Sequence, residues 1–176
     1  MKKLLILFIY LFGIMPAGSA KAFYFFSVTP PSYTIMPPTG ASSLGEISNA
    51  ILTSLQTNKT DQLTSYFLTD KEITYLRQLG SEDMNAVLEN KSNTDLKNSF
   101  ETDLETIVQE GVAKTLNWSE LSVAETKTGT GSEESRLLFP VETVLQSKLN
   151  HPVSLLYEVV KINNRYYLFR GIKLKP

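Results

Sequence analysis

The chain contains no cysteine and only one histidine among its 176 residues. Without thiols it can form no disulfide, no cysteine-ligated zinc site and no thiol nucleophile. The histidine, His151, stands in the segment Asn150-His151-Pro152, and no nucleophile elbow of the G-x-S-x-G type accompanies it. We therefore interpret His151 as a surface loop residue, and we expect no catalytic triad, no metal and no cofactor.

Net charge is also small. The chain has 17 lysines and arginines against 18 aspartates and glutamates, a formal charge of −1. This balance leaves no basic excess that would attract nucleic acid or an anionic membrane surface. We expect the partner to be a protein or a small apolar ligand, and not a nucleic acid.

A long apolar run occurs only at the start of the chain. Lys2 and Lys3 precede an apolar stretch over residues 4–15, and small residues follow, which is the pattern of a signal peptide of bacterial style. Cleavage fits after Ala20 or after Ala22. The alternative, an uncleaved anchor, needs roughly 20 apolar residues, and this stretch is shorter. We expect residues 1–20 to be a signal peptide and the protein to be exported, either periplasmic or secreted, with no integral membrane segment after cleavage.

Residues 21–42 differ in composition from the rest of the chain. Two Pro-Pro pairs forbid a helix there and favour an extended path, as in a semi-rigid linker. The segment is also rich in aromatic residues, which solvated linkers rarely are. The second interpretation is therefore an arm that docks on a partner or on the domain itself, with these candidate residues: Phe23, Tyr24, Phe25, Phe26 and Tyr33.

Residues 43–176 read as a single domain that begins with helices. Ser43 and Glu46 match a capping box, and a helix is expected from there to about residue 57. Shorter helices are expected from Asp61, from Thr69 or Asp70 to Gly80, and from Ser81 to about residue 88. The longest is expected over residues 95–117, from this apolar stripe: Leu96, Phe100, Leu104, Ile107, Val108, Gly111, Val112 and Leu116.

From Trp118 onward the apolar period changes from 3.6 to 2, which predicts strands. Strands are expected from Leu121, over residues 135–147, from Val153, and after a two-residue turn at Asn163-Asn164. Helices followed by a four-stranded antiparallel meander make an α+β fold, with the helices packed on one face of the sheet.

Two strands of this meander have unusual features. Pro140 cannot donate to a ladder, so its strand is expected at an edge of the sheet or bulged. The last strand has Tyr166 and Leu168 on one face and Tyr167 and Phe169 on the other. Because both of its faces are apolar, it is expected to be central or covered on both sides.

The C-terminal segment resembles the NTF2-like (cystatin-like α+β) superfamily, in particular its small exported proteins of unknown function. The likeness rests on the passage from the long helix to the first strand, residues 111–118, and on the closing hairpin, residues 157–169. In that hairpin Asn164 stands where the family usually has Gly, and Tyr166 where it has Trp. The resemblance covers residues 44–174 and implies a curved sheet that encloses a cone-shaped cavity. No catalytic motif of the superfamily transfers onto these residues.

Aromatic side chains are the best candidates for lining such a cavity. We name Trp118, Phe139, Tyr157 and Tyr166 as ligand-pocket candidates, although aromatic strand residues more often belong to a core. Tyrosine hydroxyls at the mouth of the cavity would orient a ligand.

Carboxylates offer the remaining route to chemistry. Glu101 and Glu105, with Asp103 nearby, lie opposite the helical stripe and are interpreted as a solvated face. Alternation points Glu142 and Glu158 to solvent. The alternative for Glu158 is a pair across strands with Arg165 or Lys161.

Three hypotheses about function follow. The first is a non-catalytic domain of the cell envelope that binds a small apolar ligand or a protein partner. The second is a structural subunit that assembles through the open face of the sheet or through residues 21–42, for example as a homodimer. The third is an isomerase or lyase with a carboxylate base in the cavity.

Overall fold

The computed structural model describes residues 39–79, 82–129, 137–147 and 151–175. The expected signal peptide, the aromatic arm candidates and the expected helix boundary at Gly80 and Ser81 lie outside these ranges.

The first helix, α1 (Leu44–Thr57), is capped by Ser43, whose Oγ accepts a hydrogen bond from the Glu46 N–H at 3.2 Å. The Glu46 carboxylate accepts hydrogen bonds from the N–H and the hydroxyl of Ser42, both at 2.8 Å. The bond from the Glu46 N–H to the Ser43 side chain is the one that the capping box predicts, so this half is confirmed. The Glu46 side chain, in contrast, bonds to Ser42 and not to the N–H of Ser43. The helix ends at Asn58, which has a φ of 52°, a conformation that Asn tolerates well.

The other predicted helices follow in the predicted order, as η1 (Asp61–Tyr66), α2 (Asp70–Leu79), α3 (Glu82–Leu88) and α4 (Asn93–Ala113). A short 3-10 helix that was not predicted, η2 (Trp118–Glu120), follows α4. The longest helix ends four residues before the predicted boundary, because Thr115 turns to a φ of 55° and the Leu116 N–H bonds back to the Gly111 carbonyl at 2.8 Å. Val112, which was assigned to the buried stripe, is 67% exposed. It lies at the margin of the stripe, where a rotation of 100° per residue has carried it away from the sheet.

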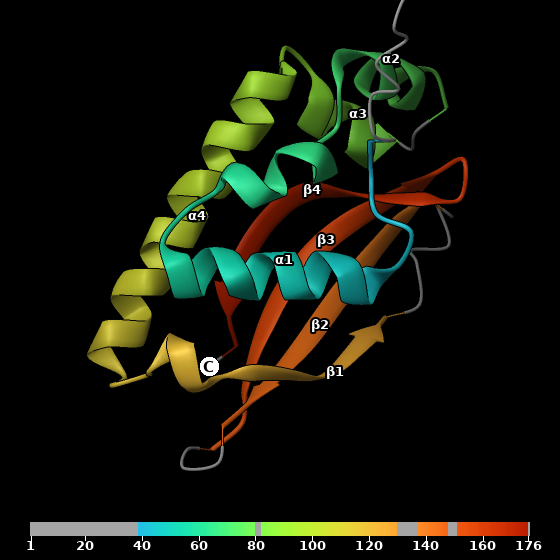
Figure 1. Cartoon of the computed structure of the whole chain (residues 1–176). Helices are drawn as coiled ribbons and strands as arrows, with labels where there is room; N and C mark the ends of the chain where they lie inside the picture. Colours follow the sequence, from blue (N-terminus) through green and yellow to red (C-terminus); the bar gives the residue numbers. More distant parts are fainter. Residues whose placement is uncertain (1–38, 80–81, 130–136, 148–150, 176) are drawn as a thin grey trace, which may run out of the picture. The chain divides into compact units, whose positions relative to one another are not determined.

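The sheet is a meander of four antiparallel strands in the order β1-β2-β3-β4, which confirms the predicted α+β class. Its strands are β1 (Ser122–Thr128), β2 (Leu138–Gln146), β3 (Val153–Ile162) and β4 (Arg165–Leu174). Figure 1 shows α1 lying across the sheet and α4 running beside β4.

The strand that contains Pro140 is not at an edge, because β2 lies between β1 and β3. Pairing between β1 and β2 ends at Thr128 and Val141. Just beyond it, the Gly129 N–H donates to the Pro140 carbonyl at 3.0 Å, so the backbone of Pro140 faces the side on which β1 has ended. The missing N–H of Pro140 therefore costs no ladder hydrogen bond.

Helical residues cover both faces of the sheet, so the prediction that they cover only one was wrong. On one face, residues of α1, η1 and α4 pack with alternate strand residues such as Leu145, Leu155 and Tyr157. On the other, α2 and α3 pack on Val160 and Phe169 near the β3–β4 hairpin. The second cluster covers only that end of its face.

The last strand, β4, is covered on both faces but stands at an edge of the sheet. Ala41 and Phe67 form isolated bridges to Tyr166 and Leu168 along its outer side. The Asp103 carboxylate accepts a hydrogen bond from the Ile172 N–H at 3.3 Å, farther along the same strand. Much of this edge is therefore already paired or covered.

Candidate functional site

The four predicted pocket aromatics belong to the packed core between the helices and the sheet. Trp118 and Tyr157 are buried there, and Phe139 and Tyr166 pack against the same cluster while keeping part of their surface exposed. Lys161 Nζ lies 5.1 Å from the centre of the Tyr166 ring. The structure thus brings the four residues into one cluster, and ligand binding by that cluster stays a prediction.

A cluster of hydroxyls, not anticipated from the sequence, lies beneath α1. The Ser48 Oγ is 2.9 Å from Thr126 Oγ1, 2.8 Å from Thr143 Oγ1 and 2.9 Å from the Tyr157 hydroxyl. Thr143 and Tyr157 are also 3.1 Å apart, and Ser48 donates to the Leu44 carbonyl at 3.0 Å. Burial raises the pKa of Tyr157, although these hydrogen bonds act in the opposite direction. The cluster joins α1 to β1, β2 and β3.

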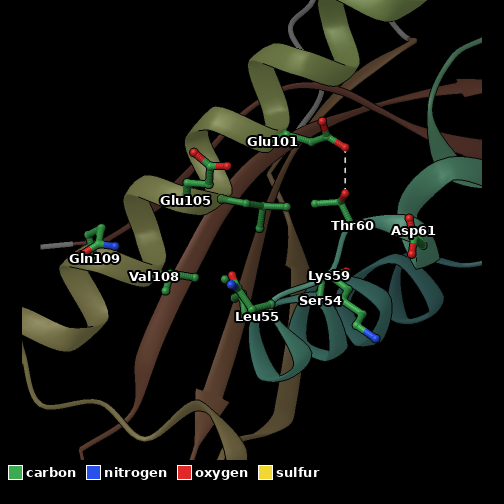
Figure 2. A pocket seen from close by; sticks show the side chains of 11 residues that line it. Ser54, Leu55, Lys59, Thr60, Asp61, Glu101, Glu105, Val108 and Gln109 are labelled. Carbon is green, nitrogen blue, oxygen red and sulfur yellow. Dashed lines mark hydrogen bonds between the residues drawn. The ribbon is translucent and has the colours of Figure 1, made fainter.

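A groove of about 520 Å³ lies between the end of α1, the segment that follows it, and α4, and Figure 2 shows the side chains that line it. We call it the helix groove. Its lining includes Lys59, Asp61, Glu101 and Glu105, and Thr60 donates a hydrogen bond of 2.8 Å to Glu101. Glu105 is exposed and Glu101 is half-buried, 3.8 Å from Lys97. The helix groove is acidic and polar, unlike the apolar cavity that the sequence predicts.

A second hollow, of about 650 Å³, crosses the open end of the other sheet face. We call it the sheet-face trough. Register defines its floor as two rows of residues that lie side by side across β2, β3 and β4. These rows are Glu142–Leu156–Lys173 and Pro140–Glu158–Arg170. The trough lies beyond the area that α2 and α3 cover.

Charges of both signs border the sheet-face trough. Glu158 forms an ion pair with Arg170, its partner in the register, and not with Lys161 or Arg165 as predicted. Glu142 lies 3.0 Å from Lys175, and this ion pair is the main cause of its lowered pKa. Lys173 takes part in none of the ion pairs found within the described ranges. The trough therefore combines an apolar centre, Leu156, with a cation that is available to a ligand.

The remaining candidate features do not form a site. His151 is exposed, as predicted. Within the part of the chain that the structure describes, no group of three His, Asp or Glu side chains is arranged to hold a metal ion, and no helix combines the length and apolarity needed to span a membrane.

Comparison with known proteins gives no match: no family model fits the chain, and neither curated proteins nor solved structures resemble it significantly. What can be said of its class is that the described residues form an α+β domain with two hollows outside its packed core.

Sequence reasoning missed Leu156, Lys173 and Arg170 as site residues. For Leu156 the signal was present in the alternation of β3, where it lies between the inward residues Leu155 and Tyr157 and therefore faces the opposite side. An apolar residue on the charged side of a strand marks a surface that is not entirely solvated.

Proposed function

We propose that the chain is an exported, non-catalytic binding domain of the NTF2-like kind, and that its sheet-face trough receives an extended segment of a protein partner. The observation that carries the proposal is the juxtaposition of half-buried Leu156 with Lys173 in one row of the trough. Leu156 offers an apolar contact, and Lys173 offers a charge without an ion-pair partner among the described residues. A segment with an apolar side chain beside a carboxylate fits both.

The rim of the trough favours a protein partner over a small apolar ligand. An apolar ligand would strip water from Glu142, Glu158 and Arg170 without replacing the lost hydrogen bonds. A peptide carries backbone N–H and C=O groups that can meet such charges. Gly171, at a φ of 50°, also leaves one position along β4 without a side chain, with open space around it. These features support an extended peptide as the ligand.

The state of the carboxylates supports binding over acid–base catalysis. A general base in an apolar cavity would have a raised pKa, whereas ion pairing lowers the pKa of Glu142. Tyr157, the tyrosine deepest in the sheet, is surrounded by the neutral hydroxyls of Ser48 and Thr143. No carboxylate among the described residues falls in the buried class. The isomerase or lyase alternative therefore has no observation in its favour.

Peptide selection with matched variants tests the proposal. A library of random 12-residue peptides would be selected on the mature chain and then tested on Leu156→Lys and Lys173→Glu. The control is Leu79→Lys, because Leu79 is 59% exposed on α2 and lies away from the trough. We expect enriched peptides that pair an apolar residue with Asp or Glu. Both trough variants should weaken binding at least about tenfold, the loss of one good contact, and the control should not.

Selected peptides that bind the trough variants and wild type equally would overturn the proposal. A preference for small apolar probes over every peptide would favour the sequence-based alternative of a small apolar ligand.

A further inference from the structure

We propose that the outer edge of β1 pairs with β1 of a second copy of this chain, antiparallel, about a two-fold axis at Thr126. This inference does not rest on the proposed function, because it uses a different edge and different contacts. It specifies the surface through which the chain assembles into a homodimer.

The two edges of the sheet differ in how far other residues cover them. The outer side of β4 is bridged by Ala41 and Phe67 and receives a hydrogen bond from Asp103. On β1, the described residues pair only with the β2 side of the strand. An edge with free N–H and C=O groups is a template for another strand.

The direction of the free groups on β1 follows from one hydrogen bond. The Gly129 N–H donates to the Pro140 carbonyl, so the backbone of Gly129 faces β2. In an antiparallel ladder successive residues face opposite sides, and the register is regular from Glu125 to Thr128. Lys127 and Glu125 therefore also direct their backbone groups to β2, while Thr126 and Thr128 direct theirs outward. Thr126 can exchange two hydrogen bonds with its own copy across a two-fold axis.

Charge makes this register self-complementary. Glu125 and Lys127 flank Thr126 and are both exposed, with their charged atoms 2.9 Å apart on the same face. In an antiparallel pair centred on Thr126, Glu125 of one copy lies opposite Lys127 of the other, and the reverse pair forms as well. Charged edge residues usually prevent association. Here a register centred on Glu125 or Lys127 would place like charges opposite each other, whereas the register centred on Thr126 places opposite charges together.

The helix above the sheet leaves room for the second copy. Ser48 contacts Thr126 of β1 and Thr143 of β2, which are register partners, and Tyr157 reaches it from β3 with a long side chain, so α1 lies over β1 and β2 at this level. That is about one strand spacing from the proposed axis, which places the two α1 helices about 10 Å apart. Packed helices approach to about 8–10 Å, so the two α1 helices meet at an ordinary packing distance and do not clash. The bulge between Val123 and Glu125 limits the new ladder to a few residues.

Sedimentation of the full mature chain tests the proposal with charge reversals. We expect wild type to dimerise reversibly, and Glu125→Lys or Lys127→Glu alone to weaken dimerisation roughly tenfold or more, because each places two like-charge pairs across the axis. The double exchange, Glu125→Lys with Lys127→Glu, should restore wild-type affinity. Glu105→Lys is the control, a reversal on an exposed residue of α4.

Thr128→Pro provides a second test that leaves charge unchanged. Proline removes an outward N–H and is tolerated at an edge strand, so it should weaken the dimer while circular dichroism stays that of wild type. A wild-type chain that is monomeric at every concentration would overturn the proposal. Single reversals without effect, or a double exchange that fails to restore affinity, would overturn it too.

Discussion

At the scale of single residues, Ser48 is the polar centre of the domain. One side chain on α1 contacts hydroxyls on three strands, at a depth where an unsatisfied polar group is costly. Four partners fix its position, so the cluster sets the register of α1 against the sheet. Buried polar networks of this kind specify one packing arrangement when every member is satisfied.

We expect Ser48→Ala to lower the free energy of unfolding by about 1–3 kcal/mol, because it leaves buried hydroxyls short of a partner. Tyr157→Phe should cost about 1 kcal/mol, since Ser48 and Thr143 stay hydrogen-bonded to each other at 2.8 Å. Urea unfolding followed by circular dichroism measures both. Tyr75→Phe is the control: Tyr75 is 39% exposed, and its change should be within about 0.5 kcal/mol of zero. Equal losses for Tyr157 and Tyr75 would contradict the role of the cluster.

The stability of the domain at alkaline pH should also depend on Tyr157. Burial raises its pKa above the ordinary value of 10.0. Above that ordinary value the unfolded chain releases the phenol proton while the folded chain keeps it, so stability falls as pH rises. We predict that the urea midpoint of wild type falls more steeply between about pH 9 and pH 11 than that of Tyr157→Phe. Parallel curves for the two proteins would show that the phenol is not protected.

At the scale of elements, hydrophobic periodicity predicted which segments form helices and strands but not how far they extend. The stripe of α4 continues in sequence to Leu116, yet the chain leaves the helix at Lys114 because Thr115 adopts a positive φ. Pro140 predicted a strand at an edge or with a bulge, whereas the structure has an interior strand, paired with β3 in regular register, at the point where its other neighbour ends. In both cases a local feature was identified correctly, while its consequence depended on a neighbour that the sequence does not specify.

Sites were predicted less well than elements. The four aromatics were named as pocket candidates and pack in or against the core, three of them from strands and Trp118 from η2. Aromatic composition cannot tell a cavity wall from a filled core. The sheet-face trough depends on cross-strand register, which brings Leu156 next to Lys173 and Glu158 next to Arg170. If β4 were shifted by one residue, neither row would form, and the register of β4 is determined by its pairing with β3.

The passage from α4 to β1 depends on a close contact between Gly111 and Trp118. A Cβ at position 111 would lie 2.5 Å from Trp118 Cζ2. We expect Gly111→Ala to destabilise the domain by about 1–3 kcal/mol despite the better helix propensity of alanine.

Gly45→Ala in α1 is the matched change. The nearest atom to a Cβ there is Ser43 Oγ at 3.9 Å, so we expect a gain of up to about 1 kcal/mol. Thermal or urea unfolding compares the two variants. Equal effects at the two positions would show that the Trp118 ring moves aside without a loss in the free energy of unfolding.

At the scale of the whole molecule, the proposed export has a direct readout. Cleavage after Ala20 gives a chain that begins at Lys21, and cleavage after Ala22 gives one that begins at Phe23. Mass spectrometry of the protein recovered from the envelope or medium of a producing bacterium should show one of these two termini. A full-length chain that keeps Met1 in the membrane fraction would favour the anchor alternative.

The proposed export does not require disulfides for stability. A domain without cysteine forms none in an oxidising compartment, so its stability depends on packing and hydrogen bonding. Two apolar clusters on opposite faces of one sheet supply that packing, and they leave one end of one face open. The proposed binding surface is therefore the part of the sheet that folding itself does not use.

The most direct test of the binding proposal is amide chemical-shift mapping of the mature chain with a peptide from the selection. We predict that the largest shifts fall on residues 141–142, 156–158 and 170–173, in the strand segments that form the sheet-face trough. The largest shifts at Trp118, Phe139 and residues 47–55 would place the ligand between α1 and the sheet, and would contradict the proposal.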